Sequence, residues 1–412
     1  MGHSHGGSET APSPWMIAQR RRVSIVLALI LGPIALITVV GLVVLWPDGD
    51  QTAARQAATS TVLPGSTFVD ASVISVSPFD CSVPGGLVAT PLTCADLVVR
   101  VEEGPDAGTS VQVQVPAEVY LAGFTAGDRL VLQRSLPVAD SPVTYSFTDF
   151  ARQSPLTWLA LAFAVAIVAV ARLRGLAALA GLGFAFAIFV LFMLPGLLNG
   201  ESPLGVALIG SSAIMFVVLY LAHGFSARTT TALAGTLFGL AMVAGLALLA
   251  GGAARLTGLG SEETLTLTYL AGGVDPTGIV LCGIIVAGLG VLNDVTITQA
   301  SAVWQLHETA PELPARQLFG RAMAIGRDHI ASTVYTIVFA YAGAALPVLL
   351  ILETLQRPFA DIVTGEAVAE EVVRTMVGSI GLVLAVPVTT AIGVLLAKSV
   401  RPDAVKATAR AR

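Results

Sequence analysis

Six polar side chains lie within nine residues directly after an apolar run, at Asn293, Asp294, Thr296, Thr298, Gln299 and Ser301. Their carboxylate, amide and hydroxyl oxygens are groups that bind a cation, a proton or a polar solute. A charged side chain inside a membrane costs about 2.5–3.5 kcal/mol, so something must offset that cost. We therefore predict an ion, proton or substrate site centred on Asp294. The alternatives are a structural cap satisfied by neighbouring Thr and Asn side chains, or exposure at the membrane surface.

The apolar run before this stretch is too short to cross a membrane alone. Residues 279–292 extend about 21 Å at about 1.5 Å per residue, whereas the hydrocarbon core is about 30 Å thick. The helix must therefore carry the polar residues at membrane depth or at the inner surface. Helical spacing puts Asp294, Thr298, Ser301 and Gln305 on one stripe, which we expect to face the interior of a helical bundle.

A second polar cluster begins the next apolar segment, in "GRDHIASTVYT". His329 shares a helical face with Ser332, Thr333 and Thr336. Because one loop joins the two segments, we include Asp328 and His329 in the candidate site. The other explanation of Asp328 is a carboxylate at a helix N-terminus.

A third contribution comes from Thr389, which follows Pro387 in the last apolar segment. Proline frees a backbone carbonyl in a membrane helix. Thr389 and Thr390 can complete a polar seam with the first two clusters. A packing role explains these threonines equally well.

Metal and enzyme chemistry have little support in the sequence. His3 and His5 are a weak metal-binding pair in the N-terminal tail, and we predict no metal site and no cofactor. The chain lacks a phosphate-binding G-x-x-x-x-G-K-[ST] loop, a paired-histidine zinc protease motif and a G-x-S-x-G nucleophile turn. These absences lead us to expect no enzyme. An intramembrane catalyst that uses Asp294 and His329 stays a third alternative, and it would need the two side chains within hydrogen-bond reach or joined by one water.

The composition requires a membrane around these residues. Of 412 residues, 55% are hydrophobic and only 12% are charged, whereas soluble domains are about one quarter charged. The mean hydropathy of +0.81 agrees. The protein is therefore a polytopic membrane protein, with the lipid bilayer as its first partner. No basic patch indicates nucleic-acid binding.

We predict a mainly α membrane fold with eight transmembrane helices. Their residue ranges are 23–46, 155–172, 175–197, 203–223, 229–252, 277–303, 329–352 and 376–398. The first is too long for a signal peptide and is an uncleaved anchor. The remaining seven form a membrane domain over residues 154–398.

Both termini are expected in the cytoplasm, as tails over residues 1–22 and 399–412. This orientation places Arg20, Arg21 and Arg22 inside, together with most other Lys and Arg residues. The short outside loops contain only Arg255, Arg357 and Arg374. The asymmetry obeys the positive-inside rule.

Residues 47–153 are expected to form an extracytoplasmic antiparallel β-domain. Five Val-rich stretches there alternate polar and apolar side chains, and turn signals such as "GPDAG" separate them. The pattern is typical of a small OB-like barrel. A disulfide between Cys81 and Cys94 is plausible if this region faces outward.

Two further patterns have an ordinary explanation and a functional one. The "GTLFG" motif, Gly235 to Gly239, is expected to serve close helix packing. Glu366, Glu370 and Glu371 contribute to an acidic outer mouth. That mouth is either a solvated acidic face or a region that attracts cations.

Three late motifs together resemble a known family. "GLGVLNDVTITQASAVWQL", "AIGRDHIASTVYTIVFAYAGAALP" and "GSIGLVLAVPVTTAIGVLLA" are similar to the actinobacterial branch of the YibE/F-like membrane proteins. In many members the first motif contains a Met-Asp-Val-Ala-x-Ser pattern, and here Asn293-Asp294-Val295-Thr296 stands in its place. The resemblance implies a multi-pass protein of the bacterial inner membrane and carries no settled biochemical function.

From these features we expect a secondary transporter or permease for a small solute or ion. Asp294 would be the binding carboxylate, assisted by Asn293, Thr298 and Gln299. The alternative is a non-transporting membrane scaffold whose outside β-domain binds an envelope partner. A homo-oligomer is compatible with either function.

Overall fold

The computed structural model describes residues 14–47, 66–82, 92–135, 142–271, 273–354, 356 and 358–399. The chain divides into two compact units, each of which is considered by itself. One is made of Met1–Ala54 and Val170–Arg412, and the other of Arg55–Ala169. The predictions about His3 and His5 and about most of the C-terminal tail lie outside the described residues.

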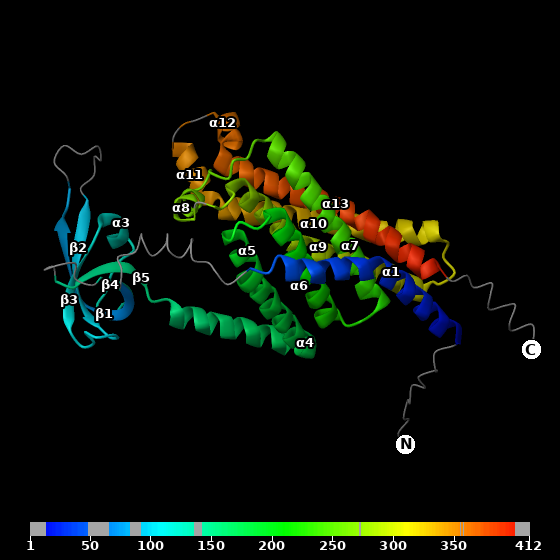
Figure 1. Cartoon of the computed structure of the whole chain (residues 1–412), viewed down its shortest axis with the longest axis horizontal. Helices are drawn as coiled ribbons and strands as arrows, with labels where there is room; N and C mark the ends of the chain where they lie inside the picture. Colours follow the sequence, from blue (N-terminus) through cyan, green and yellow to red (C-terminus); the bar gives the residue numbers. More distant parts are fainter. Residues whose placement is uncertain are drawn as a thin grey trace, which may run out of the picture. The chain divides into compact units, whose positions relative to one another are not determined.

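The smaller unit contains a five-stranded antiparallel sheet (Figure 1). Its strands are β1 (Thr67–Asp80), β2 (Thr93–Val101), β3 (Ser110–Val115), β4 (Arg129–Ser135) and β5 (Thr144–Phe150). They are ordered β3-β2-β1-β4-β5, and β3 also contacts β5. The short helix α3 (Ala117–Tyr120) follows β3. The sheet that the alternating sequence predicts is therefore confirmed.

Strand alternation builds the core of this unit. Successive side chains of a strand point to opposite faces, so every second residue is buried. Val69, Ala71 and Val73 of β1 pack in this way against Leu97 and Val99 of β2. The opposite set of side chains on the same strands is polar or partly exposed.

Two sets of side-chain links join different parts of the sheet. Cys81 and Cys94 form a disulfide with Cα atoms 5.7 Å apart, next to the point where β1 ends and β2 begins. The buried guanidinium of Arg134 donates from Nε to Asp106 Oδ2 at 2.7 Å. Tyr145 Oη also donates to that oxygen at 2.5 Å. These hydrogen bonds lower the pKa of the Asp106 carboxyl below its ordinary value, with the bond from Tyr145 the largest cause.

The larger unit is helical. Its elements are α1 (Pro14–Val44), α4 (Gln153–Ile188, shared with the smaller unit), η1 (Phe189–Met193), α5 (Leu194–Leu198), α6 (Pro203–His223), α7 (Ala227–Ala253), α8 (Glu262–Leu270), α9 (Pro276–Thr309), α10 (Ala315–Ala344), α11 (Leu346–Thr354), α12 (Phe359–Thr364) and α13 (Glu366–Lys398). Ser202, Ser226 and Ser261 accept backbone N–H bonds at the starts of α6, α7 and α8. These serines are N-caps, which explains where the three helices begin.

Several of these helices are membrane-length. Among the described residues, six are long and apolar enough to cross a bilayer, or seven if the bent pair α10 and α11 forms one span. The predicted spans 155–172 and 175–197 fall in one 46-residue stretch, Gln153–Leu198. Arg172 interrupts that stretch with a φ of 55° and a ψ of −131°. The chain is therefore a mainly helical membrane protein that also contains an antiparallel sheet.

The centre of the bundle is formed by α7, α9 and α13, which lie side by side (Figure 1). Gly235 of α7 leaves no room for a side chain, because a Cβ there would overlap Thr389 Oγ1 of α13. Gly239, one turn later, similarly faces Leu292 of α9. The GxxxG motif thus allows close helix packing.

Candidate functional site

The helix α9 presents two different faces. Leu292, Thr296, Gln299 and Val303 are almost completely buried in the bundle. On the opposite side, Asp294 is exposed in the bare protein, with 67% of its side chain accessible. The expected stripe of polar residues therefore exists, but our expectation that it faces the bundle interior is wrong.

The rest of the stripe follows Asp294. Gln305 is exposed, and Thr298 and Ser301 are half-buried. Ser301 Oγ donates to the carbonyl of Ile297 at 2.7 Å on its own helix. The face of α9 that is buried in the bundle instead contains the side chains that pack against α7 and α13. Leu292 and Val303 are among them.

Two of the predicted site residues form a closed polar seam inside the bundle. Thr296 Oγ1 lies 2.6 Å from Thr236 Oγ1 of α7 and donates to the carbonyl of Leu292. Gln299 Nε2 donates to Thr390 Oγ1 of α13 at 2.7 Å and to the carbonyl of Ala322 of α10 at 3.0 Å. Because these buried groups bond to one another, Thr296 and Gln299 join four helices.

Thr389 lies beside this seam without joining it. Its hydroxyl is fully buried against Gly235 and has no hydrogen-bond partner among the described residues. Its neighbour Thr390 makes the bond to Gln299 instead. Of the two threonines that we expected to complete a polar seam, only Thr390 therefore does so.

The structure brings Asp294 and His329 together. His329 Nε2 of α10 lies 3.6 Å from Asp294 Oδ2, within ion-pair range and slightly too far for a direct hydrogen bond. That nitrogen is buried and bonds to no other described atom. Asn293 Oδ1, one residue before Asp294, is likewise buried without a partner. The contact of α9 with α10 thus contains an acid-base pair in which His329 Nε2 has no other hydrogen-bond partner among the described residues.

Asp328 does not join this pair. Its side chain is exposed, and the ion pair with Asp294 is made by His329. Ser332 and Thr333 donate to the backbone carbonyl of His329. These hydroxyls therefore bond within their own helix and do not bind the imidazole of His329.

Asp294 lies far from both ends of its helix. About 27 Å of α9 precede it and about 22 Å follow it, at about 1.5 Å per residue. Leu292 and Thr296, on either side of Asp294 in the sequence, contact Gly239 and Thr236 of α7. Those two residues are near the middle of the 27-residue α7. The carboxylate is thus near half-height in the bundle.

A second charged cluster lies where α13 begins. Arg374 Nη1 pairs with Glu371 Oε1, and Tyr341 of α10 lies within electrostatic range of both. Glu370 Oε1, Glu371 Oε2 and Arg374 Nε are buried and unpartnered within the described part of the chain. We expected these glutamates only at an acidic mouth and missed their pairing with Arg374. The spacing of three and four residues in "EEVVR" was the available signal.

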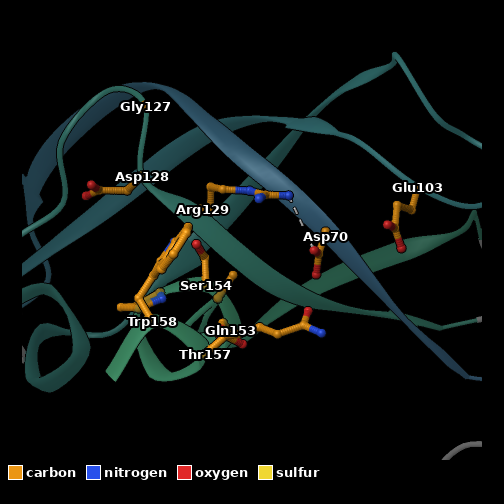
Figure 2. Close-up of a pocket in the computed structure, with 11 residues that line it drawn as sticks. Asp70, Glu103, Gly127, Asp128, Arg129, Gln153, Ser154, Thr157 and Trp158 are labelled. Atoms are coloured by element: carbon orange, nitrogen blue, oxygen red, sulfur yellow. Dashed lines mark hydrogen bonds and ion pairs between the residues drawn. The ribbon is translucent and has the colours of Figure 1, made fainter. Parts of the chain in front are cut away.

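The β-unit has a cleft of its own. Its volume is about 650 Å³, and its lining includes Asp70, Glu103, Asp128, Arg129 and Trp158. Figure 2 shows the side chains of Arg129 and Asp70 turned toward each other; their charged atoms are 3.6 Å apart. The lining has a net negative charge, because Asp70, Glu103 and Asp128 outnumber Arg129. Arg129 also pairs with Glu102, at 2.9 Å.

A metal centre is not evident in these clusters. No group of three or more His, Cys, Asp or Glu residues is arranged to hold a metal ion in the ranges that the structure describes. The free Cys282 is buried in α9.

A family model described as YibE/F-like protein matches residues 159–399. The match covers more than half of the chain. The protein belongs to the YibE/F-like family. No curated protein and no solved structure matches it significantly. The matched region of this YibE/F-like protein contains α9, α10 and α13, and it leaves out all five strands.

Proposed function

We propose that this YibE/F-like membrane protein is a secondary transporter or permease for a small solute or ion. The observation that carries the proposal is the Asp294–His329 pair near half-height in the bundle. An ionisable residue at membrane depth is costly and typically serves an ion, proton or substrate pathway. Asp294 would bind the cation or cationic group, and His329 would compete with it for the carboxylate.

The pair offers a simple coupling mechanism. With His329 protonated, Asp294 is neutralised by the imidazolium. Loss of that proton leaves a carboxylate that a cation from solution can neutralise. The site would be neutral with either positive charge in place, and the uncompensated carboxylate would be the costly state between them.

We propose an eight-span arrangement with both termini inside a bacterial inner membrane. The break at Arg172 supports two spans within Gln153–Leu198, since about 69 Å of continuous helix would exceed the bilayer core more than twofold. The bent pair α10 and α11 supplies another span. The β-unit would then be extracytoplasmic. Its strand order and the contact of β3 with β5 support an OB-like barrel.

The test is flux into proteoliposomes across a panel of ions and small solutes. Asp294→Asn keeps the shape of the side chain and removes its charge, so transport should fall at least about tenfold, as for loss of a group acting at the rate-limiting barrier. Glu308→Gln is the matched control, since it removes one charge from an exposed position of the same helix. Equal flux in wild type and Asp294→Asn would refute the proposed role of Asp294.

A non-transporting scaffold is the second candidate. The acidic cleft of the β-unit favours it, because a cleft of about 650 Å³ is large enough for a ligand or a partner side chain. Photocrosslinking from Trp158 and Glu103 positions in cells would capture a stoichiometric envelope partner under this proposal. Asp294 and His329 do lie 3.6 Å apart, close to the distance that an intramembrane catalyst would need. We do not propose catalysis as the function, because the neighbouring hydroxyls of Ser332 and Thr333 donate to the backbone carbonyl of His329 and not to its imidazole.

A further inference from the structure

Helix α10 is covered along one face and exposed along the other. Its buried residues Leu318, Gly326 and Ile337 pack against residues of α9 and α13. The opposite face is exposed at intervals of four and three residues, which is the spacing of a helix that packs lengthwise on another helix. We call this surface the open face of α10; its residues are Arg327, Asp328, Ser332, Tyr335 and Phe339.

The open face is more polar than a surface that meets lipid. On α1, by contrast, the exposed large side chains are Ile, Leu and Val, as at Leu29, Leu36 and Val43. By its own composition α10 does not qualify as a membrane span, and it does so only together with α11. Charged side chains of membrane helices almost always face other protein or water. The open face therefore needs a cover other than lipid.

Two opposite charges of the open face lack a counter-charge in their own chain. Arg327 Nε donates to the backbone carbonyl of Met323 at 3.2 Å, and neither Arg327 nor Asp328 forms an ion pair with a described residue. As neighbours in a helix, the two side chains point in different directions and do not pair with each other. They lie about 18–20 Å from the start of α10, next to His329 and so level with the Asp294–His329 pair.

We propose that the open face of α10 is the contact surface between two copies of this chain. Two copies in one membrane have the same orientation, so their α10 helices run parallel about a twofold axis and meet along identical residues. A face with one positive and one negative charge is complementary to itself in this arrangement. Arg327 of each copy pairs with Asp328 of the other, and the two Ser332 side chains meet near the axis.

The dimer has a consequence for the Asp294–His329 pair. The side chain of Asp294 is 67% accessible in the single chain, and its partner His329 adjoins Asp328 of the open face. A second copy on that face shields the pair from lipid and leaves it at a contact between proteins. The dimer itself does not depend on the proposed transport.

The experiment is disulfide crosslinking of the full-length protein in the membranes of the cells that express it. Ser332→Cys puts a thiol at the centre of the proposed contact, and Leu36→Cys puts one on the exposed side of α1 as a matched control. Under oxidation Ser332→Cys should form a covalent dimer at least about tenfold faster than Leu36→Cys, because its two thiols are held together and do not meet by diffusion. The unmodified chain should form none, since its free Cys282 is buried.

Exchange of charges tests the pairing directly. Asp328→Arg alone, or Arg327→Asp alone, gives each open face two like charges. Either change should therefore reduce crosslinking through Ser332→Cys at least about tenfold. Coexpression of the two variants should restore crosslinking between them, because one open face is then doubly positive and the other doubly negative. A misfolded chain would not recover in this way, so the rescue separates pairing from folding.

Four results would overturn the proposal. Equal crosslinking of Ser332→Cys and Leu36→Cys would indicate random collision. A Ser332→Cys chain that stays monomeric would leave the open face without a second copy. Crosslinking of Ser332→Cys to a different protein would assign the face to another partner. Crosslinking that neither charge variant reduces would refute the pairing of Arg327 with Asp328 on which the contact is built.

Discussion

Gln299 of α9 and Thr390 of α13 are joined by a hydrogen bond of 2.7 Å between two almost completely buried side chains. The same amide nitrogen also reaches the backbone of α10. Gln299 is therefore a junction of three helices. Thr389, the residue before Thr390, is equally buried and forms no such bond to the described residues.

This contrast makes Thr390→Val and Thr389→Val a matched pair. Thr390→Val should destabilise the bundle by about 0.6–1.7 kcal/mol, the range for hydrogen bonds between membrane helices. Thr389→Val should be neutral or stabilising, because it removes a buried hydroxyl without a partner. Equilibrium unfolding in mixed detergent and SDS micelles measures both. Equal losses in the two variants would contradict the role of the Gln299–Thr390 bond.

Close packing at Gly235 gives a second prediction. Gly235→Ala should cost about 1–3 kcal/mol, because the new methyl group overlaps Thr389 Oγ1 and the helices must separate. Gly245→Ala, on the same helix, places a methyl group in open space and should be neutral or stabilising by up to about 1 kcal/mol. The same unfolding assay compares them. A harmless Gly235→Ala would show that α7 and α13 do not need this contact.

The Asp294–His329 pair predicts non-additive transport defects. If the two side chains act as one unit, Asp294→Asn and His329→Gln should each reduce flux, and the double variant should be no worse than the poorer single variant. If the two losses of flux add fully in the double variant, the two residues act independently and the prediction fails. Detergent-solubilised protein that elutes as one symmetrical peak serves as the folding control for each variant.

The β-unit should lose stability in acid through Asp106. Hydrogen bonds from Tyr145 and Arg134 lower the pKa of this carboxyl in the folded state. The stabilisation is therefore fully present above the ordinary aspartate pKa of about 3.9 and is lost as the pH falls through the lower folded value. Hydrogen exchange of the β2 and β3 peptides between pH 5 and pH 2.5 measures this loss. Asp106→Asn should flatten that acid dependence, whereas Glu118→Gln, at an exposed position, should leave it unchanged.

Much of the architecture could be predicted from the sequence. The strand positions follow from period-two alternation, as in β2, where Leu97, Val99 and Val101 point inward. The helices follow from long apolar runs. The number of spans is harder to predict, since a bend such as that between α10 and α11 depends on tertiary packing.

The site was predictable only in part. Periodicity identifies the residues of α9 that share a face with Asp294, but it does not say which face is buried. The interior face of a membrane helix can also contain polar groups if residues on other helices form hydrogen bonds with them. Thr296 and Gln299 are such groups in α9. Those partners come from α7, α10 and α13, and single-sequence reasoning cannot place them. The pairing of Glu371 with Arg374 was missed for a different reason, since its spacing also fits an ordinary solvated helix face.

The continuity of α9 from Pro276 to Thr309 limits how Asp294 can move. Thr296 and Gln299 are held inside by bonds to three neighbouring helices, and Asp294 is on the same uninterrupted rod, pointing away. Turning the carboxylate inward by rotating α9 about its axis would break the bonds of both buried residues together. The hydrogen-bonded seam and an inward-facing Asp294 therefore cannot exist at the same time. A rotation of α9 that brought the carboxylate inward would have to break the bonds of Thr296 and Gln299 in one step.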